Sequence, residues 1–226
     1  MDDVACVLSR AVWPAAAAIV LFVAGTGAGA VDPPTLGTIR HVAESYLRSG
    51  PPGPVDLEAV VLGRRFDGVV LIRDETGATF VQPAGESLVA AGDRVRVRGT
   101  VKDGVIINGI TRATLERIGV GAAPEPRKIR PDDLAAGTFY HDLVTATGVV
   151  RSVQPLAGSS GPGSIMMLNV PGGSIEIRSE VTIPEVAGLV DAEVRVTGYG
   201  GGEANAARQL LRPFVRVVDR GDVRIE

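Results

Sequence analysis

Hydrophobic and polar residues alternate strictly along residues 93–102, whose sequence is Asp-Arg-Val-Arg-Val-Arg-Gly-Thr-Val-Lys. Successive side chains of a β-strand point to opposite faces, so the valines share one face and the arginines share the other. This pattern is typical of an antiparallel sheet that is buried on one side and wet on the other. The wet face of the predicted strand carries Arg94, Arg96 and Arg98.

A related stretch recurs in the second half of the chain. Residues 191–199, Asp-Ala-Glu-Val-Arg-Val-Thr-Gly-Tyr, contain the Val-Arg-Val-x-Gly sequence that is also found at residues 95–99. The same alternation places Val194, Val196 and Gly198 on the buried face. A strand that is repeated in both halves predicts two copies of one β unit.

The first β unit is predicted at residues 54–119. Asp74-Glu-Thr-Gly77 and Asp103-Gly104 have the residue types of tight turns between antiparallel strands. Five strands, with a longer connection between the third and the fourth, predict a small Greek-key barrel of the OB type. The predicted strands span residues 55–62, 68–73, 78–82 and 94–102, and segments 105–107 and 110–118 complete the unit.

The second unit is predicted at residues 141–226 and repeats this arrangement. Residues 31–53 form a lead-in with helical spacing of apolar residues at 38–48, and residues 120–140 form a proline-rich connector. The predicted fold is therefore all-β, with two tandem small OB-like Greek-key barrels and a short N-terminal helix. Its later strands are expected at 143–153, 164–170, 174–178, 192–197 and 210–218.

Residues 1–30 differ from the rest of the chain. An apolar run at residues 11–24 follows Arg10, and Ala28-Gly29-Ala30 provides the small residues of a signal-peptidase site. The run is shorter than the ~20 residues that span a bilayer. We therefore expect a signal peptide cleaved near Ala30 and a periplasmic or secreted protein. The alternative is an uncleaved segment that anchors the protein to a membrane.

Composition limits the chemistry of the mature protein. The single cysteine of the 226 residues, Cys6, lies in the predicted signal peptide, so no disulfide or thiolate metal site is expected. No Gly-x-Ser-x-Gly motif is present, the acidic residues lack metal-ligand spacing, and His41 and His141 are expected to be exposed. These observations predict no enzymatic activity, no metal and no cofactor. A hydrolase fragment is the least favoured function.

Several fragments together resemble a known family. Residues 69–81 contain Asp-x-Thr-Gly, residues 92–100 contain Gly-Asp-x-Val-x-Val-x-Gly, and shorter matches lie at 148–151 and 205–209. Across residues 36–226 the chain resembles the extracytoplasmic β-rich region of some bacterial sensor histidine kinases, here without a membrane span or kinase. The resemblance implies a non-enzymatic binding or sensory module in signal transduction, with a small molecule or a protein as its partner.

The best candidate for a polar site is residues 205–209, which follow the glycine run 200–202. Glycine allows a ligand or another backbone to approach closely. The candidate residues are either ligand-binding or inter-domain, and we favour a contact in which Arg208 fixes the angle between the barrels through charge-assisted bonds. The candidates are Asn205, Arg208 and Gln209.

A single-stranded nucleic-acid binder is the alternative function, because OB barrels often bind single strands. Such sites combine a basic groove with exposed aromatic rings. The three arginines at 94–98 provide a possible basic face, but aromatic residues make up 4% of the chain, and the first unit contains only Phe66 and Phe80, the latter expected in the core. The pI near 5.5 and the predicted export also oppose this function. Nucleic acid is therefore predicted to be an unlikely partner.

Overall fold

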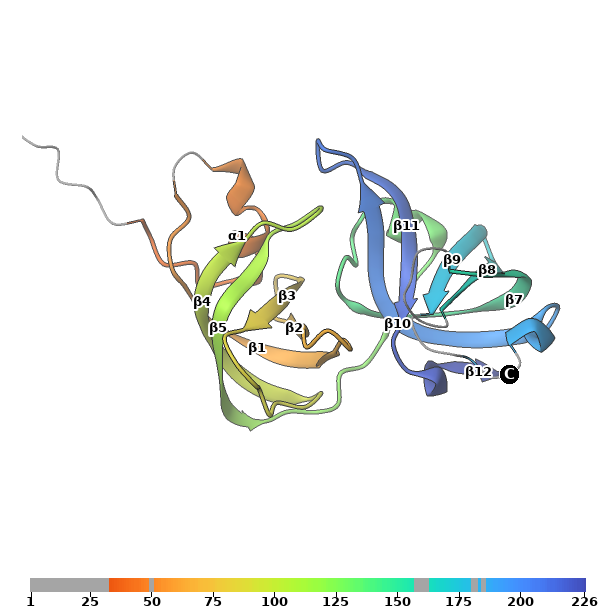
Figure 1. The fold of residues 1–226 in the computed structure, drawn as a ribbon, viewed down its shortest axis with the longest axis horizontal. Coiled ribbons are helices and arrows are strands. Elements are labelled where there is room, and N and C mark those ends of the chain that lie inside the picture. Colours follow the sequence, from red (N-terminus) through yellow and green to blue (C-terminus); the bar gives the residue numbers. More distant parts are fainter. Residues whose placement is uncertain (1–32, 49–50, 157–162, 180–182, 184–185) are drawn as a thin grey trace, which may run out of the picture. The chain divides into compact units, whose positions relative to one another are not determined.

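The computed structural model describes residues 33–48, 51–156, 163–179, 183 and 186–226 (Figure 1). The predicted signal peptide lies outside these residues. Most of the described chain is β-strand, with short helical segments between the strands. Within the described residues, no helix has both the length and the hydrophobicity needed to cross a membrane.

The first barrel is a closed ring of five strands in the order β1-β2-β3-β5-β4. The β3–β5 pair is parallel, and the other neighbouring strands are antiparallel. A five-stranded Greek-key barrel is the arrangement that defines the OB type, as predicted. The strands are β1 (Val55–Arg64), β2 (Val70–Arg73), β3 (Ala78–Pro83), β4 (Asp93–Lys102) and β5 (Gly109–Val120).

The alternating pattern of β4 fills the interior of this barrel. Val95 and Val97 are completely buried, whereas the arginines beside them point outward. Helix α1 (Ile39–Ala43) adds Ile39 and Val42 to the same core, and Thr38 accepts a hydrogen bond from the amide of His41 at its start. The helix is shorter than the predicted stretch 38–48 because a 3₁₀ turn, η1 (Ser45–Leu47), follows it.

The second barrel has the same strand order. Its strands follow β7-β8-β9-β11-β10, and a β10–β7 pairing joins the two ends of this order. As in the first barrel, the pair between the third and fifth strands, β9–β11, is parallel. The strands are β7 (Leu143–Pro155), β8 (Ser164–Val170), β9 (Gly173–Ser179), β10 (Glu193–Ala204) and β11 (Leu210–Val217).

Strands β4 and β10, which carry the repeated sequence, hold equivalent positions. Each pairs in antiparallel fashion with the first strand of its barrel, β1 or β7. Val194 and Val196 are buried like their counterparts in β4. The chain is therefore two OB-like units in tandem.

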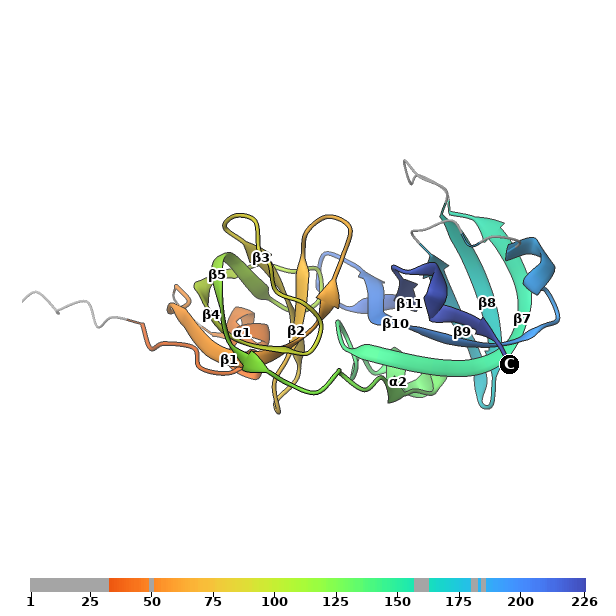
Figure 2. The same cartoon turned by 90° about the horizontal axis from the view of Figure 1, so that it is seen from below.

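Three segments extend the second barrel beyond this ring. The predicted connector contains β6 (Arg127–Lys128), which is parallel to β7, and helix α2 (Pro131–Ala135), whose first turn contains a proline and an acidic cap (Figure 2). A 3₁₀ turn, η3 (Arg220–Asp222), leads into β12 (Val223–Ile225), which pairs with β10. Another 3₁₀ turn, η2 (Val186–Leu189), precedes β10.

The glycine run 200–202 lies within strand β10 and does not form a turn. Its backbone pairs with β11, with Gly201 opposite Phe214. A Cβ atom on Gly200 would lie 2.0 Å from the carbonyl oxygen of Phe139. Glycine is thus required here because two backbones pack closely. The sequence alone does not show whether a glycine is needed for such packing or for a turn.

Candidate nucleic-acid interface

A cavity of about 620 Å³ lies where β10 meets the first barrel. In the first barrel it is bounded by β2 and β3, by the loop 65–69 between β1 and β2, and by the loop that follows β4. These are the elements with which OB barrels bind oligonucleotides and oligosaccharides. Its remaining wall is formed by Tyr140, His141, Tyr199, residues 200–202 and Arg216.

Tyr199 attaches β10 to the first barrel at the base of this cavity. It packs into a small apolar cluster with Leu62, Val69, Leu71 and Ala78, and its Oη donates a hydrogen bond of 3.4 Å to the carbonyl of Leu62. Burial raises the pKa of Tyr199 to about 12, so the phenol stays a neutral donor at ordinary pH. The cavity wall is therefore built on a packed contact.

Aromatic rings form one side of the cavity. The His141 ring lies edge-on to Phe80 at 5.2 Å and to Tyr140 at 4.3 Å between centroids. Phe80 is only partly buried, which differs from the expected core position, because its ring packs over Gly109 and faces the cavity. On the adjacent loop, Phe66 is 76% exposed.

Three cationic side chains, Arg65, Lys102 and Arg216, line the same cavity. Desolvation lowers the pKa of His141 to about 3, and the positive charges of Arg65 and Arg216 act in the same direction. Burial raises the pKa of Tyr140, while the same two arginines oppose that rise. Two guanidinium groups thus act on one aromatic wall and make it electropositive.

The lining also contains two carboxylates. Arg65 pairs with Asp67 at 3.1 Å, Lys102 donates a hydrogen bond to Gln82, and Asp103 lies at the rim. Cations therefore outnumber carboxylates by three to two, although the whole chain has a net charge of −3. The local charge is opposite in sign to the average.

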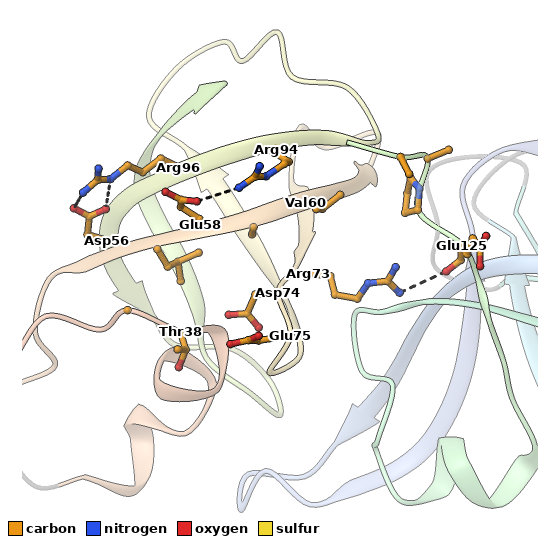
Figure 3. A pocket seen from close by; sticks show the side chains of 16 residues that line it. Thr38, Asp56, Glu58, Val60, Arg73, Asp74, Glu75, Arg94, Arg96 and Glu125 are labelled. Atoms are coloured by element: carbon orange, nitrogen blue, oxygen red, sulfur yellow. Dashed lines mark hydrogen bonds and ion pairs between the residues drawn. The ribbon is translucent and has the colours of Figure 1, made fainter. Parts of the chain in front are cut away.

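The predicted basic face, Arg94, Arg96 and Arg98, lies on the outer surface of β4 and is neutralised. Arg96 holds Asp56 through two bonds of 2.7 and 2.8 Å (Figure 3). Arg98 contacts the same carboxylate at 3.3 Å. Arg94 pairs with Glu58 at 3.5 Å. Hydrogen bonds from Arg96 and Arg98 lower the pKa of Asp56 to about 2. These arginines form an ion-paired strand face.

The larger groove along this face has a volume of about 970 Å³, but its lining contains three arginines and five carboxylates. Asp74 points toward the groove in Figure 3, yet its oxygens accept hydrogen bonds from the amides of Ile39, Thr76 and Gly77. Carboxylates outnumber arginines in this groove and most of its charged groups already have a partner, so it is a poorer binding site than the smaller cavity.

The structure places Asn205, Arg208 and Gln209 in the β10–β11 hairpin. The side-chain oxygen of Asn205 accepts hydrogen bonds from the amides of Ala207 and Gln209, and its side-chain nitrogen donates one to the side chain of Gln209. Asn205 and Gln209 therefore shape the turn. Arg208 instead reaches Asn108 at 2.7 Å and Asp103 at 3.3 Å in the first barrel. Its guanidinium also stacks over Tyr46 at 4.7 Å from the ring centroid.

No site for metal or histidine catalysis emerges from the described part of the chain. It contains no group of three or more His, Cys, Asp and Glu residues placed to hold a metal. Asp142 binds Arg73 at 3.0 Å and Arg127 at 3.1 Å, so its carboxylate is already held by two arginines. His41 is exposed as expected, whereas the prediction that His141 is exposed was wrong, because the rings of Phe80 and Tyr140 pack against it and leave it half-buried.

No family model matches the chain, and no curated protein matches it. A murine DNA-binding protein bound to double-stranded DNA has a TM-score of 0.41 and 11% identity, and the match covers 71% of this chain and 92% of that one. For the Ifi202 HINa domain with 20-bp double-stranded DNA, the TM-score is 0.40, the identity 9%, and the coverage 73% and 94%.

A replication protein A heterotrimer bound to single-stranded DNA matches with a TM-score of 0.32 and 9% identity, covering 74% of this chain and 50% of that one. The tandem OB-like arrangement of this chain is defined by its own strand pairings. All three of these structures contain bound DNA. The prediction that the present chain is not an enzyme stays a prediction.

The comparisons contradict the resemblance to sensor histidine kinases, since the structures they identify are DNA-binding proteins. The interpretation as a sensory module depended on that resemblance, so it was also wrong. The physical reason lies in the motifs: Asp-x-Thr-Gly forms the β2–β3 turn, and Gly-Asp-x-Val-x-Val-x-Gly begins β4. Both motifs are explained by the strands and turns of this barrel, so they do not indicate a kinase.

The prediction that nucleic acid is an unlikely partner was also wrong in light of these DNA-bound structures. It depended on the average charge and on the small number of aromatic residues. The fold instead gathers Phe80, Tyr140 and Tyr199, together with three cations, around one cavity. Tyr140 and Tyr199 lie far from Phe80 in sequence, so their proximity could not be seen from either unit alone.

Proposed function

We propose that the chain binds single-stranded nucleic acid across the cavity between β10 and the β2–β3 face of the first barrel. The observation that carries this proposal is the coincidence of aromatic rings and cations on the oligonucleotide-binding elements of an OB barrel. Bases stack on exposed rings, and cations follow the phosphate backbone. Phe66, 76% exposed on the loop beside the cavity, provides the outermost stacking platform.

A single strand fits this site better than a duplex. The aromatic rings of Phe80 and Tyr140 line a cavity, and only unstacked bases present their faces to such rings. A duplex is held mainly through many phosphate contacts, and three cations provide few of these. The site therefore favours a short stretch of unpaired nucleotides.

Fluorescence anisotropy with a labelled oligothymidylate tests this proposal. With three phosphate contacts on a single strand, the logarithm of the association constant should fall with the logarithm of the salt concentration with a slope of about −2. Phe66→Ala should weaken binding by about 5- to 100-fold, the usual range for removing one stacking ring. Lys102→Gln should make the salt dependence shallower by about 0.7.

Arg151→Gln is the matched control, because it removes one positive charge from an exposed ion pair with Asp191 in the second barrel. It should leave the affinity unchanged. A duplex of the same sequence should bind more weakly. Equal affinity for an uncharged oligosaccharide, or equal losses in Lys102→Gln and Arg151→Gln, would refute nucleic-acid binding at this cavity.

We also propose that binding takes place after export. The support is the apolar run at residues 11–24 followed by Ala28-Gly29-Ala30. N-terminal sequencing of protein recovered from the expressing cells should give Val31 as the first residue. Recovery of protein that still begins at Met1, only from the cytoplasm, would reject export without affecting the binding site.

A further inference from the structure

A second groove lies on the outer face of the β7–β10 pair, with a volume of about 500 Å³. β6 pairs with β7 and β12 pairs with β10, and both contribute to its lining. Its residues are distinct from those around the cavity between the barrels. The side chains used in the argument below are Lys128, Thr145, Thr147, Arg195, Asp222 and Arg224.

This groove occupies the position in the second barrel that the ion-paired face occupies in the first. In the first barrel, Glu58 lies opposite Arg96 across the β1–β4 pair. The repeated sequence aligns Arg96 with Arg195, and Thr147 lies opposite Arg195 across the β7–β10 pair. The same register aligns Asp56 with Thr145. Two carboxylates of the first barrel are thus replaced by threonines in the second.

The balance of charge is also reversed between the two grooves. The groove of the first barrel contains three arginines and five carboxylates, whereas that of the second contains three cations and the single carboxylate of Asp222. Glu226, outside the lining, pairs with Arg195 at 2.8 Å. Half-exposed pairs of this kind contribute little to stability, so an anion can replace Glu226 at small cost.

The other two cations remain available to a ligand. The Nε of Arg224 donates a hydrogen bond of 3.1 Å to the carbonyl of Gly221. Its terminal nitrogens are therefore left for another acceptor. Across the described residues, neither the Lys128 ammonium group nor the Thr147 hydroxyl has a hydrogen bond or ion pair. The groove therefore combines a lysine, two arginines and a hydroxyl donor around one space.

We propose that this groove binds a phosphate group, either as free phosphate or as part of a nucleic-acid backbone. Phosphate has several acceptor oxygens and up to two negative charges, which match guanidinium, ammonium and hydroxyl donors that converge from different strands. A lysine acts as a point charge, and arginine adds paired hydrogen bonds. The negative charge of Asp222 repels the phosphate group and limits its affinity.

NMR titration of the full chain with inorganic phosphate, at ionic strength held constant with sodium chloride, tests the site. Amide resonances of Thr145, Thr147, Thr197 and Gly221 should shift and saturate at millimolar phosphate. The double variant Thr145→Asp/Thr147→Glu restores the carboxylates of the first barrel and should weaken binding at least tenfold. Lys128→Gln, which changes only an exposed side chain, should weaken it about threefold to tenfold, the range expected for one ordinary hydrogen bond.

The reverse exchange in the first barrel provides a matched test. Asp56→Thr/Glu58→Thr removes the carboxylates that neutralise Arg94 and Arg96, and should produce new phosphate-dependent shifts on β1 and β4. Absence of saturable shifts in the wild type, or identical titrations of wild type, Lys128→Gln and the β7 double variant, would overturn the site.

Oligonucleotide binding separates the two sources of phosphate. If the β7 double variant weakens oligonucleotide and phosphate binding together, the groove holds part of a nucleic-acid strand. If phosphate binding is lost and oligonucleotide affinity is unchanged, the ligand is a free phosphate species. Both results support the groove. Phe66→Ala, which alters only the loop beside the cavity of the proposed function, shows whether that separate proposal fails.

Discussion

Arg208 donates a hydrogen bond of 2.7 Å to Oδ1 of Asn108, which lies 100 residues earlier in the chain. Asn108 is buried, and its side-chain amide donates in turn to the hydroxyl of Ser45 at 2.9 Å. The β10–β11 hairpin is thereby tied to the loop between β4 and β5. Since residues of that loop line the cavity between the barrels, this bond helps to set the width of the proposed nucleic-acid site.

We expect Arg208→Ala to leave both barrels folded and to loosen their connection. The variant loses a charge-assisted bond to Asn108, an ion pair with Asp103 and the stacking contact with Tyr46. Double electron–electron resonance with one label on each barrel should show a broader distance distribution. Arg212→Ala, which removes an exposed arginine from the same hairpin, is the control. Matching distributions for Arg208→Ala and the wild type would exclude this role.

The pH dependence of stability should reveal the desolvation of His141 in the folded chain. Desolvation lowers its pKa in the folded chain to about 3, below the ordinary value of 6.5. Between these values the unfolded chain binds more protons, so stability rises with pH and is lost as the pH falls from 6.5 toward 3. The ring resonances of His141 should therefore stay constant between about pH 5 and pH 8.

Thermal unfolding of His141→Gln gives an independent measurement. The variant lacks the titrating ring, so its melting temperature should depend less on pH between about 4 and 6.5 than that of the wild type. The comparison uses the slope, because the substitution also changes packing against Phe80 and Tyr140. Parallel pH profiles for the two proteins would contradict the lowered pKa.

Asp56 should contribute to stability in a lower pH range. Its pKa is lowered from 3.8 to about 2 by its bonds to Arg96 and Arg98. The stabilisation is present above the unfolded pKa and is lost as the pH falls through the folded value. The difference in melting temperature between the wild type and Asp56→Asn should thus be largest above about pH 4 and should shrink near pH 2. Glu75→Gln is the control, because Glu75 forms no ion pair with any other described residue.

The barrels could be predicted from sequence because their determinants are local. Alternation of valine with polar residues specifies the faces of β4 and β10, and Asp74 and Gly77 identify the turn between β2 and β3. The cavity could not be predicted, because Phe80 and Tyr199 meet only after both barrels have folded. The neutralisation of Arg94, Arg96 and Arg98 could not be predicted either, since it depends on which carboxylates of β1 pair with them across the sheet.

Gly200 should be far more sensitive to substitution than its sequence context indicates. A Cβ atom there would lie 2.0 Å from the carbonyl oxygen of Phe139, and that oxygen belongs to backbone that cannot rotate away. The same backbone region accepts the amide of His141 at the carbonyl of Gly200, at 2.8 Å. Gly200→Ala must therefore displace the wall of the proposed nucleic-acid site, at a cost of about 1–3 kcal/mol in the free energy of unfolding.

Gly188→Ala is the matched control, because no atom lies within 4 Å of its added Cβ. It should change the free energy of unfolding by less than about 0.5 kcal/mol, as surface substitutions do. Chemical denaturation gives both values, and anisotropy with oligothymidylate should show weaker binding for Gly200→Ala alone. Equal stabilities of the two variants would mean that β10 can move away from Phe139. The close approach of the two backbones would then not explain why glycine occupies the wall of this cavity.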